Sequence, residues 1–192
     1  MTETLLEEHE IRDGRSWLKS YYFARAAFSI AWVIVAFTLA ADTTVLAGAL
    51  LIVYPAWDAV ANVVDAQRNG GLRRNASQSL NAIVSTLTTA AVAVALGMSM
   101  FAVLAVFGVW ATLSGLFQLT TGIRRWRSVG AQWAMVLSGA QSAVVGVMFL
   151  VKASGPAAPG IVDVAPYAGF GAFYFLVSAL WLAYSGRRRG PA

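Results

Sequence analysis

Two carboxylates and an amide follow one another on one face of an otherwise apolar stretch. Residues 46–69 read LAGALLIVYPAWDAVANVVDAQRN, with Asp58, Asn62 and Asp65 at intervals of four and three residues. In a helix, this spacing places all three side chains on the same face. A carboxylate in an apolar surrounding is costly unless it is paired or hydrated, so we expect this face to point into protein.

A basic residue is expected close to these carboxylates. Pairing the first two apolar segments as an antiparallel hairpin brings Arg25 level with Val60, next to Asp58 and Asn62. We therefore predict a buried polar cluster, whose members are Arg25, Asp58, Asn62, Asp65 and Gln118. One interpretation is a clamp that holds helices together, and the other is a protonatable site on a proton or solute path. Pro55, just before the acidic face, predicts a helix kink.

The remaining residue types argue against catalysis. The chain contains no cysteine, and its single histidine, His9, lies in an acidic segment near the start. We find neither a nucleophile with a partner base nor a cluster with metal-ligand spacing. Asp58 and Asp65 are two helical turns apart, about 10 Å, which is too far for a dyad that shares a proton. We therefore expect no enzyme activity, no cofactor and no metal.

Composition indicates a membrane protein. Of the 192 residues, 58% are hydrophobic and 12% charged, against about 25% charged in a typical soluble domain. The net charge of +5 does not gather in one basic patch, so we expect no nucleic-acid partner. We predict an all-α fold with a polar segment over residues 1–16, interpreted as a short amphipathic helix ending near Gly14 or as a tail. The six-helix transmembrane domain covers 17–189, with spans at about 17–41, 44–66, 78–97, 99–122, 130–151 and 167–185.

The basic residues predict the orientation. With six spans, Lys152 is alone on one side and the other thirteen fall on the opposite side. Those thirteen are Arg12, Arg15, Lys19, Arg25, Arg68, Arg73, Arg74, Arg124, Arg125, Arg127, Arg187, Arg188 and Arg189. Basic residues concentrate in cytoplasmic loops, so both termini are predicted to be cytoplasmic.

The six spans read as three copies of a two-helix hairpin. The segment that begins at Phe107 aligns without gaps on the one that begins at Phe170, and the segment around Gly48 aligns less well. An even number of spans per copy keeps the orientation, so the three repeats are expected to be parallel. Small residues recur every four positions in two spans, which predicts close helix packing. These ladders include Ser85, Thr89, Ala93 and Gly97 in one span and Ala134, Ser138, Ser142 and Gly146 in the other.

Three two-helix repeats whose even helices end in arginine resemble the HdeD-like acid-resistance membrane proteins. The residues that carry the resemblance are Gly48, Gly108, Gly171 and Pro55 together with those arginines. The resemblance implies a protein of the bacterial cytoplasmic membrane linked to acid or general stress. Two functions stay open: a structural or interaction protein, and a small channel or carrier that uses the Asp58 cluster. The expected partners are the lipid bilayer and either further copies of the chain or other membrane proteins.

Overall fold

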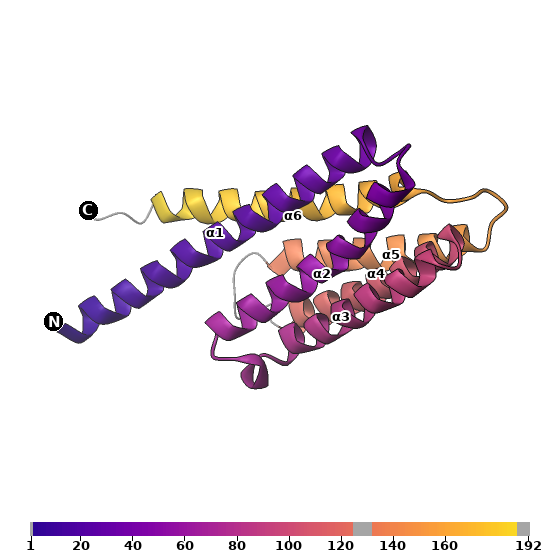
Figure 1. Cartoon of the computed structure of the whole chain (residues 1–192). Helices are drawn as coiled ribbons and strands as arrows, with labels where there is room; N and C mark the ends of the chain where they lie inside the picture. Colours follow the sequence, from indigo (N-terminus) through magenta and orange to yellow (C-terminus); the bar gives the residue numbers. More distant parts are fainter. Residues whose placement is uncertain (1, 125–131, 188–192) are drawn as a thin grey trace. The chain divides into compact units, whose positions relative to one another are not determined.

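The computed structural model describes residues 2–124 and 132–187, and these ranges hold helices and loops but no strand (Figure 1). The predicted all-α class is therefore confirmed. The elements are α1 (Thr2–Thr38), α2 (Thr44–Arg68), the 3-10 helix η1 (Leu72–Arg74), α3 (Ala76–Leu96), α4 (Met100–Arg124), α5 (Gln132–Ala153) and α6 (Ile161–Arg187).

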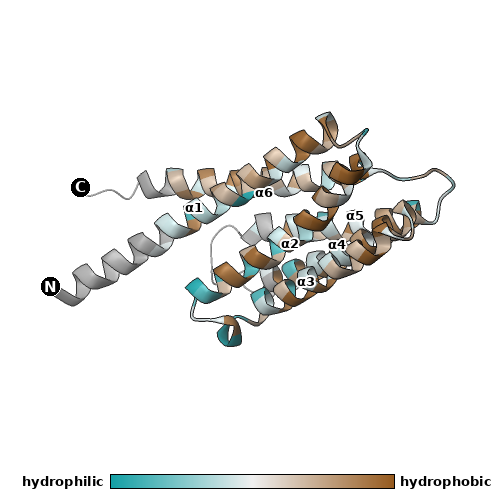
Figure 2. Ribbon diagram, viewed as in Figure 1, coloured by the Kyte–Doolittle hydropathy of each residue, from teal (hydrophilic) through white to brown (hydrophobic). Residues whose placement is uncertain are grey.

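Six helices in the described ranges contain a stretch long and apolar enough to cross a membrane. The stretches are Ser16–Thr38, Thr44–Arg68, Ala76–Leu96, Met100–Thr120, Val136–Ala153 and Ile161–Tyr184. At about 1.5 Å of rise per residue, roughly 20 residues span the hydrocarbon core of a bilayer. In Figure 2, hydrophobic residues follow the helices and hydrophilic ones gather at the connection between α2 and α3. The chain is a multi-pass helical membrane protein.

Two helices begin earlier than the sequence indicates. The start of the chain is neither a separate short helix nor a tail, because α1 runs without a break from Thr2 through Gly14 to Thr38. A single helical glycine weakens a helix by only about 0.5–1 kcal/mol and need not end it. The last helix begins at Ile161, not at about Tyr167, and includes Pro166. Its first turn is capped by Asp163, whose Oδ2 accepts a hydrogen bond from the Gly160 amide at 2.8 Å.

The chain divides into two compact units, which we describe separately. The terminal unit comprises the residues up to Ala31 together with those from Ala168 onward, and the central unit comprises Trp32–Tyr167. Both boundaries fall inside helices, α1 and α6. The threefold parallel repeat remains a prediction.

In the central unit, neighbouring helices in the sequence pack on one another. Helix α2 packs on α3, α3 on α4, and α4 on α5. Gly97, Met98 and Ser99 form the short connection predicted between the third and fourth spans, and the Ala102 amide donates to the Ser99 hydroxyl at 3.1 Å. The largest fully buried side chains include Leu51, Val92, Val103, Leu104, Phe107 and Val164.

Glycines bring α4 and α5 into backbone contact. A Cβ atom added at Gly115 would lie 2.5 Å from the Ala143 nitrogen and 2.6 Å from the Gly139 oxygen. Seven residues away on each helix, a Cβ at Gly146 would lie 2.7 Å from the Gly108 oxygen. In lipid, where packing replaces the hydrophobic drive between helices, such close approach of backbones is a main source of association. These four glycines form what we call the α4–α5 seam.

The seam and the α3 face clarify the predicted ladders. Of the predicted ladder on α5, Gly146 lies in the seam. The other seam residue of this helix is Gly139, which the ladder does not include, and Ser138 and Ser142 are half-buried. On α3, Ser85 is buried and Thr89 half-buried, whereas Ala93 and Gly97 are exposed. A spacing of four drifts by about 40° per step against the 3.6-residue turn. The buried face of α3 follows intervals of three and four instead, through Ala82, Ser85, Thr88, Val92 and Ala95. The Ala134 side chain lies outside the described residues.

Replacing Gly115 by alanine is expected to lower the free energy of unfolding by about 1–3 kcal/mol, because the new methyl group must displace the α5 backbone. Gly169→Ala in α6 is the matched control, since a Cβ there meets nothing within 4 Å. That change should be neutral or stabilising by up to about 1 kcal/mol. Thermal or denaturant unfolding of the purified proteins in detergent measures both, and equal stability of the two variants would contradict the seam.

Candidate functional site

The acidic face of α2 is built around Asp58. Helix α2 continues through Pro55, and Asp58 lies half-buried one turn later. The Asn62 side-chain amide donates to the Asp58 carbonyl at 2.8 Å and to Asp58 Oδ2 at 3.0 Å. Asn62 is itself 9% exposed. The two residues therefore meet as their spacing of four predicts, with the amide holding one carboxylate oxygen in place.

Ser85 of α3 connects this carboxylate to α4. The fully buried Ser85 hydroxyl donates to Asp58 Oδ2 at 2.8 Å and accepts from the Trp110 indole nitrogen at 3.0 Å. An indole N–H can only donate, so the serine oxygen must accept from it and direct its own proton to the carboxylate. A chain of two hydrogen bonds thus joins the three helices: Trp110 of α4 donates to Ser85 of α3, and Ser85 donates to Asp58 of α2. We call Asn62, Asp58, Ser85 and Trp110 the Asp58 network.

Asp65 repeats the arrangement seven residues further along α2. Its Oδ1 accepts from the Asn69 amide at 2.9 Å, and its Oδ2 accepts from the Gln78 amide of α3 at 3.1 Å. Both carboxylates thus bond an asparagine four residues ahead and a polar residue of α3. The residue numbers of both interhelical pairs, 58 with 85 and 65 with 78, add up to the same value, as they must in an antiparallel pair in constant register.

An aromatic cluster surrounds Trp110. The Tyr54 ring lies 4.9 Å from Trp32 and 5.8 Å from Trp110, and Trp110 also meets Phe107 edge-on at 5.7 Å. Tyr167 extends the cluster to Phe149 of α5, at 6.0 Å. Trp32 further donates from its indole nitrogen to the Leu50 carbonyl at 2.8 Å. This carbonyl precedes that of Leu51 by one residue. The Leu51 carbonyl has no intrahelical donor, because Pro55, four residues later, lacks an N–H. The cluster meets the Asp58 network at Trp110, whose indole nitrogen donates to Ser85.

Arg25 belongs to the terminal unit and has aromatic neighbours there. Its guanidinium lies 4.2 Å from the centre of the Phe175 ring, and one of its nitrogens donates to the Tyr21 hydroxyl at 3.1 Å. Tyr21 in turn stacks on Trp17 at 5.1 Å. Cation–π contact of this kind stabilises a basic side chain within a span. Because Arg25 and Asp58 lie in different units, their pairing stays a prediction.

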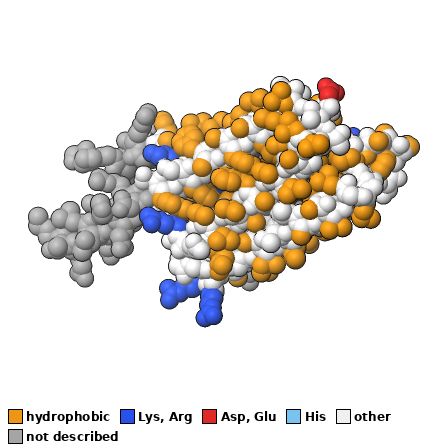
Figure 3. Space-filling model, viewed as in Figure 1, with side chains coloured by type: hydrophobic (Ala, Val, Ile, Leu, Met, Phe, Trp, Pro, Cys, Tyr) orange, Lys and Arg blue, Asp and Glu red, His pale blue; other side chains and the backbone are white. Residues whose placement is uncertain are grey.

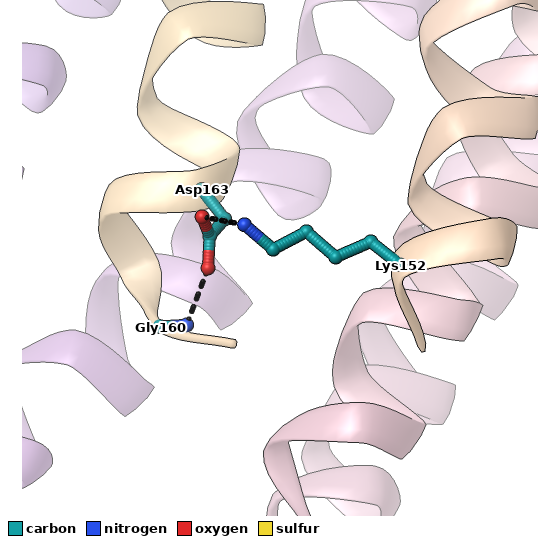
Figure 4. Close-up of polar contacts among 3 residues, drawn as sticks. All are labelled: Lys152, Gly160 and Asp163. Atoms are coloured by element: carbon teal, nitrogen blue, oxygen red, sulfur yellow. Dashed lines mark hydrogen bonds and ion pairs between the residues drawn. The ribbon is translucent and has the colours of Figure 1, made fainter. Parts of the chain in front are cut away.

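Gln118, the remaining member of the predicted polar cluster, has no hydrogen bond to Asp58 within the described part of the chain. Gln118 is half-buried on α4, two turns beyond Trp110. In the last turn of α5, Lys152 forms an ion pair with Asp163, which also caps α6 (Figure 4). Among the side chains that the structure describes, no group of three from His, Cys, Asp or Glu could hold a metal ion.

Several members of these networks are missing from the sequence prediction. Trp110, Asn69 and Gln78 are absent from it, and Ser85 appears only as a packing residue. One signal could have identified the asparagine: the pattern Asp-x-x-x-Asn occurs at 58–62 and again at 65–69. Trp110 and Gln78 have no such signal, because their roles depend on which face of a neighbouring helix meets α2.

One comparison with known proteins identifies a similarity. A family model described as "Short repeat of unknown function (DUF308)" matches residues 80–151, which cover most of α3, all of α4 and most of α5. No curated protein and no solved structure matches the chain. The matched segment contains Ser85, Trp110 and the α4–α5 seam, whereas Asp58 precedes it.

Replacing Ser85 by alanine is expected to lower the free energy of unfolding by about 1–2 kcal/mol, because it removes two interhelical hydrogen bonds and leaves the buried Trp110 N–H without its acceptor. Thr86→Val is the matched control, since the Thr86 hydroxyl bonds only the Ala82 carbonyl of its own helix in the described part of the chain. Denaturant titration in detergent compares them. A double-mutant cycle of Ser85→Ala with Trp110→Phe should give a coupling of roughly 0.5–1 kcal/mol, and additive losses would contradict the bond.

Proposed function

We propose that this chain is a structural or interaction protein of the bacterial cytoplasmic membrane, not an enzyme, and that it serves in the response to acid or general stress. The resemblance of its repeats to HdeD-like proteins supports the link to stress, and the match of residues 80–151 to a short repeat of unknown function is consistent with that resemblance. The bias of basic residues supports a cytoplasmic location of both termini, because only Lys152 falls on the other side.

The observation that carries the structural function is the bonding of Asp58. Its Oδ2 accepts from Asn62 of its own helix and from Ser85 of the neighbouring helix, and Ser85 is held in turn by Trp110. A carboxylate bonded in this way fixes the register of α2, α3 and α4. The second carboxylate, Asp65, is bonded to α3 in the same register. Both acidic residues of the span thus serve helix association.

A small channel or carrier for protons or a solute is the competing function. One observation favours it: Asp58 is a titratable group only half-buried within a membrane span, as the groups of a proton path are. Asparagine at position 58 separates the two functions. Its side-chain oxygen can still accept from Ser85 and Asn62, but it cannot bind and release a proton.

The purified protein in proteoliposomes that contain a pH-sensitive dye is expected to show no proton flux above empty vesicles when a pH gradient is imposed. Asp58→Asn should behave identically and retain stability to within about 1 kcal/mol, because the neutral amide keeps the hydrogen bonds. Asp58→Leu, which loses them, should be clearly less stable. Proton flux in the native protein that Asp58→Asn abolishes would overturn the structural function.

In the host bacterium, deletion of the gene is expected to reduce survival after an acid shock, counted as colonies relative to the unshocked culture. The native gene and the Asp58→Asn variant should both restore survival, since the variant keeps the hydrogen bonds of the Asp58 network. Unchanged survival of the deletion strain under acid, heat and osmotic shock would contradict the stress function.

A further inference from the structure

The connection between α2 and α3 places basic side chains at the membrane surface. It comprises residues 69–75, Asn-Gly-Gly-Leu-Arg-Arg-Asn, and includes η1. Because α2 and α3 each have the length and composition of a span, this loop lies where the bilayer meets water. Arg73 and Arg74 are exposed, and Leu72 beside them is 40% exposed. In Figure 3, basic side chains project from the lower edge of the molecule, where Figure 1 places η1.

Hydrogen bonds hold this loop in one conformation. The Asn75 side-chain amide donates to the carbonyls of Asn69 at 2.8 Å and Gly71 at 2.9 Å, and more weakly to Ala66 at 3.3 Å. The Ser79 hydroxyl of α3 donates to the Leu72 carbonyl at 2.6 Å. The tight turn requires glycine at Gly70 and Gly71, whose φ angles are +95° and +94°. The two arginines therefore project from a preformed turn, which reduces the entropy lost on binding.

The positive charge of the turn is available to an outside anion. Asp65, the nearest carboxylate in the sequence, accepts hydrogen bonds from Asn69 and Gln78. The aliphatic part of Arg74 lies over Gly70, with its Cδ 3.4 Å from where a Cβ would be. Its guanidinium and that of Arg73 thus extend from adjacent positions at the membrane surface, with an exposed leucine next to them.

We propose that this turn binds the phosphate headgroup of an anionic phospholipid. Guanidinium groups match phosphate oxygens in a two-pronged geometry that a lysine ammonium does not reproduce. Leu72 inserts among the acyl chains of the same leaflet, which distinguishes a lipid from a phosphate ion in solution. The inference depends on the membrane location of the chain and not on its role in stress.

Spin-labelled phosphatidylglycerol in phosphatidylcholine vesicles that contain the full chain tests this proposal. The association constant relative to spin-labelled phosphatidylcholine should favour the anionic lipid. Arg73→Gln/Arg74→Gln should lower that constant by at least about fivefold, the effect of roughly one juxtamembrane arginine. Arg73→Lys/Arg74→Lys should also lower it, although the charge is kept. Leu72→Ser should weaken lipid association as well, and the unfolding of all these variants should remain native-like because the three side chains are exposed.

Three results would overturn the proposal. One is an equal loss with Arg124→Gln/Arg125→Gln, which removes the same charge elsewhere and would indicate a diffuse attraction. The second is full retention of binding by the double lysine variant, which would exclude guanidinium recognition. The third is displacement of the labelled lipid by inorganic phosphate at constant ionic strength, which would indicate a site for the free ion.

Discussion

A carboxylate within the hydrocarbon part of a membrane costs at least about 2.5 kcal/mol unless polar groups surround it, and the central unit is arranged to supply such groups to Asp58. Ser85 must face α2 to donate to this carboxylate, and Trp110 must face α3 to donate to Ser85. These two requirements fix the rotation of α3 and α4 about their axes. The aromatic rings of Tyr54, Trp32 and Tyr167 pack around Trp110 and connect the end of α1 and the start of α6 to the other helices of the same unit.

Two kinds of contact join the helices of the central unit. On the α2–α3 side, hydrogen bonds from side chains to Asp58 and Asp65 set a constant antiparallel register. On the α4–α5 side, glycines allow backbones to touch, and the Thr112 hydroxyl of α4 lies against Gly146 of α5. The first kind is specific because each donor needs its acceptor, and the second because the contact leaves no room for a methyl group. Since lipid offers little hydrophobic drive between helices, both kinds are needed.

The interior and the surface of the chain serve different proposed purposes. Between the helices, the half-buried carboxylates of Asp58 and Asp65 are bonded to asparagine, serine and glutamine, which suits a part that holds helices together. At the surface, the α2–α3 turn combines exposed arginines with an exposed leucine on a conformation held by Asn75. A protein of this design would act through its shape and its contacts with lipid or other proteins. The Lys152–Asp163 ion pair joins the last turn of α5 to the first turn of α6.

Composition and periodicity were sufficient for the membrane class, the six spans, the short hairpin at Gly97–Ser99 and the shared helix face of Asp58 and Asn62, because these depend on residues near one another in the chain. On α3 the buried face departs from the predicted four-residue ladder beyond Thr89, since a helix turns every 3.6 residues. The donors Ser85, Gln78 and Trp110 were assigned only by the packed helices, because which faces meet depends on the rotation and register of separate segments. The same holds for the seam, where Gly139 and Gly115 meet because α4 and α5 cross at those residues.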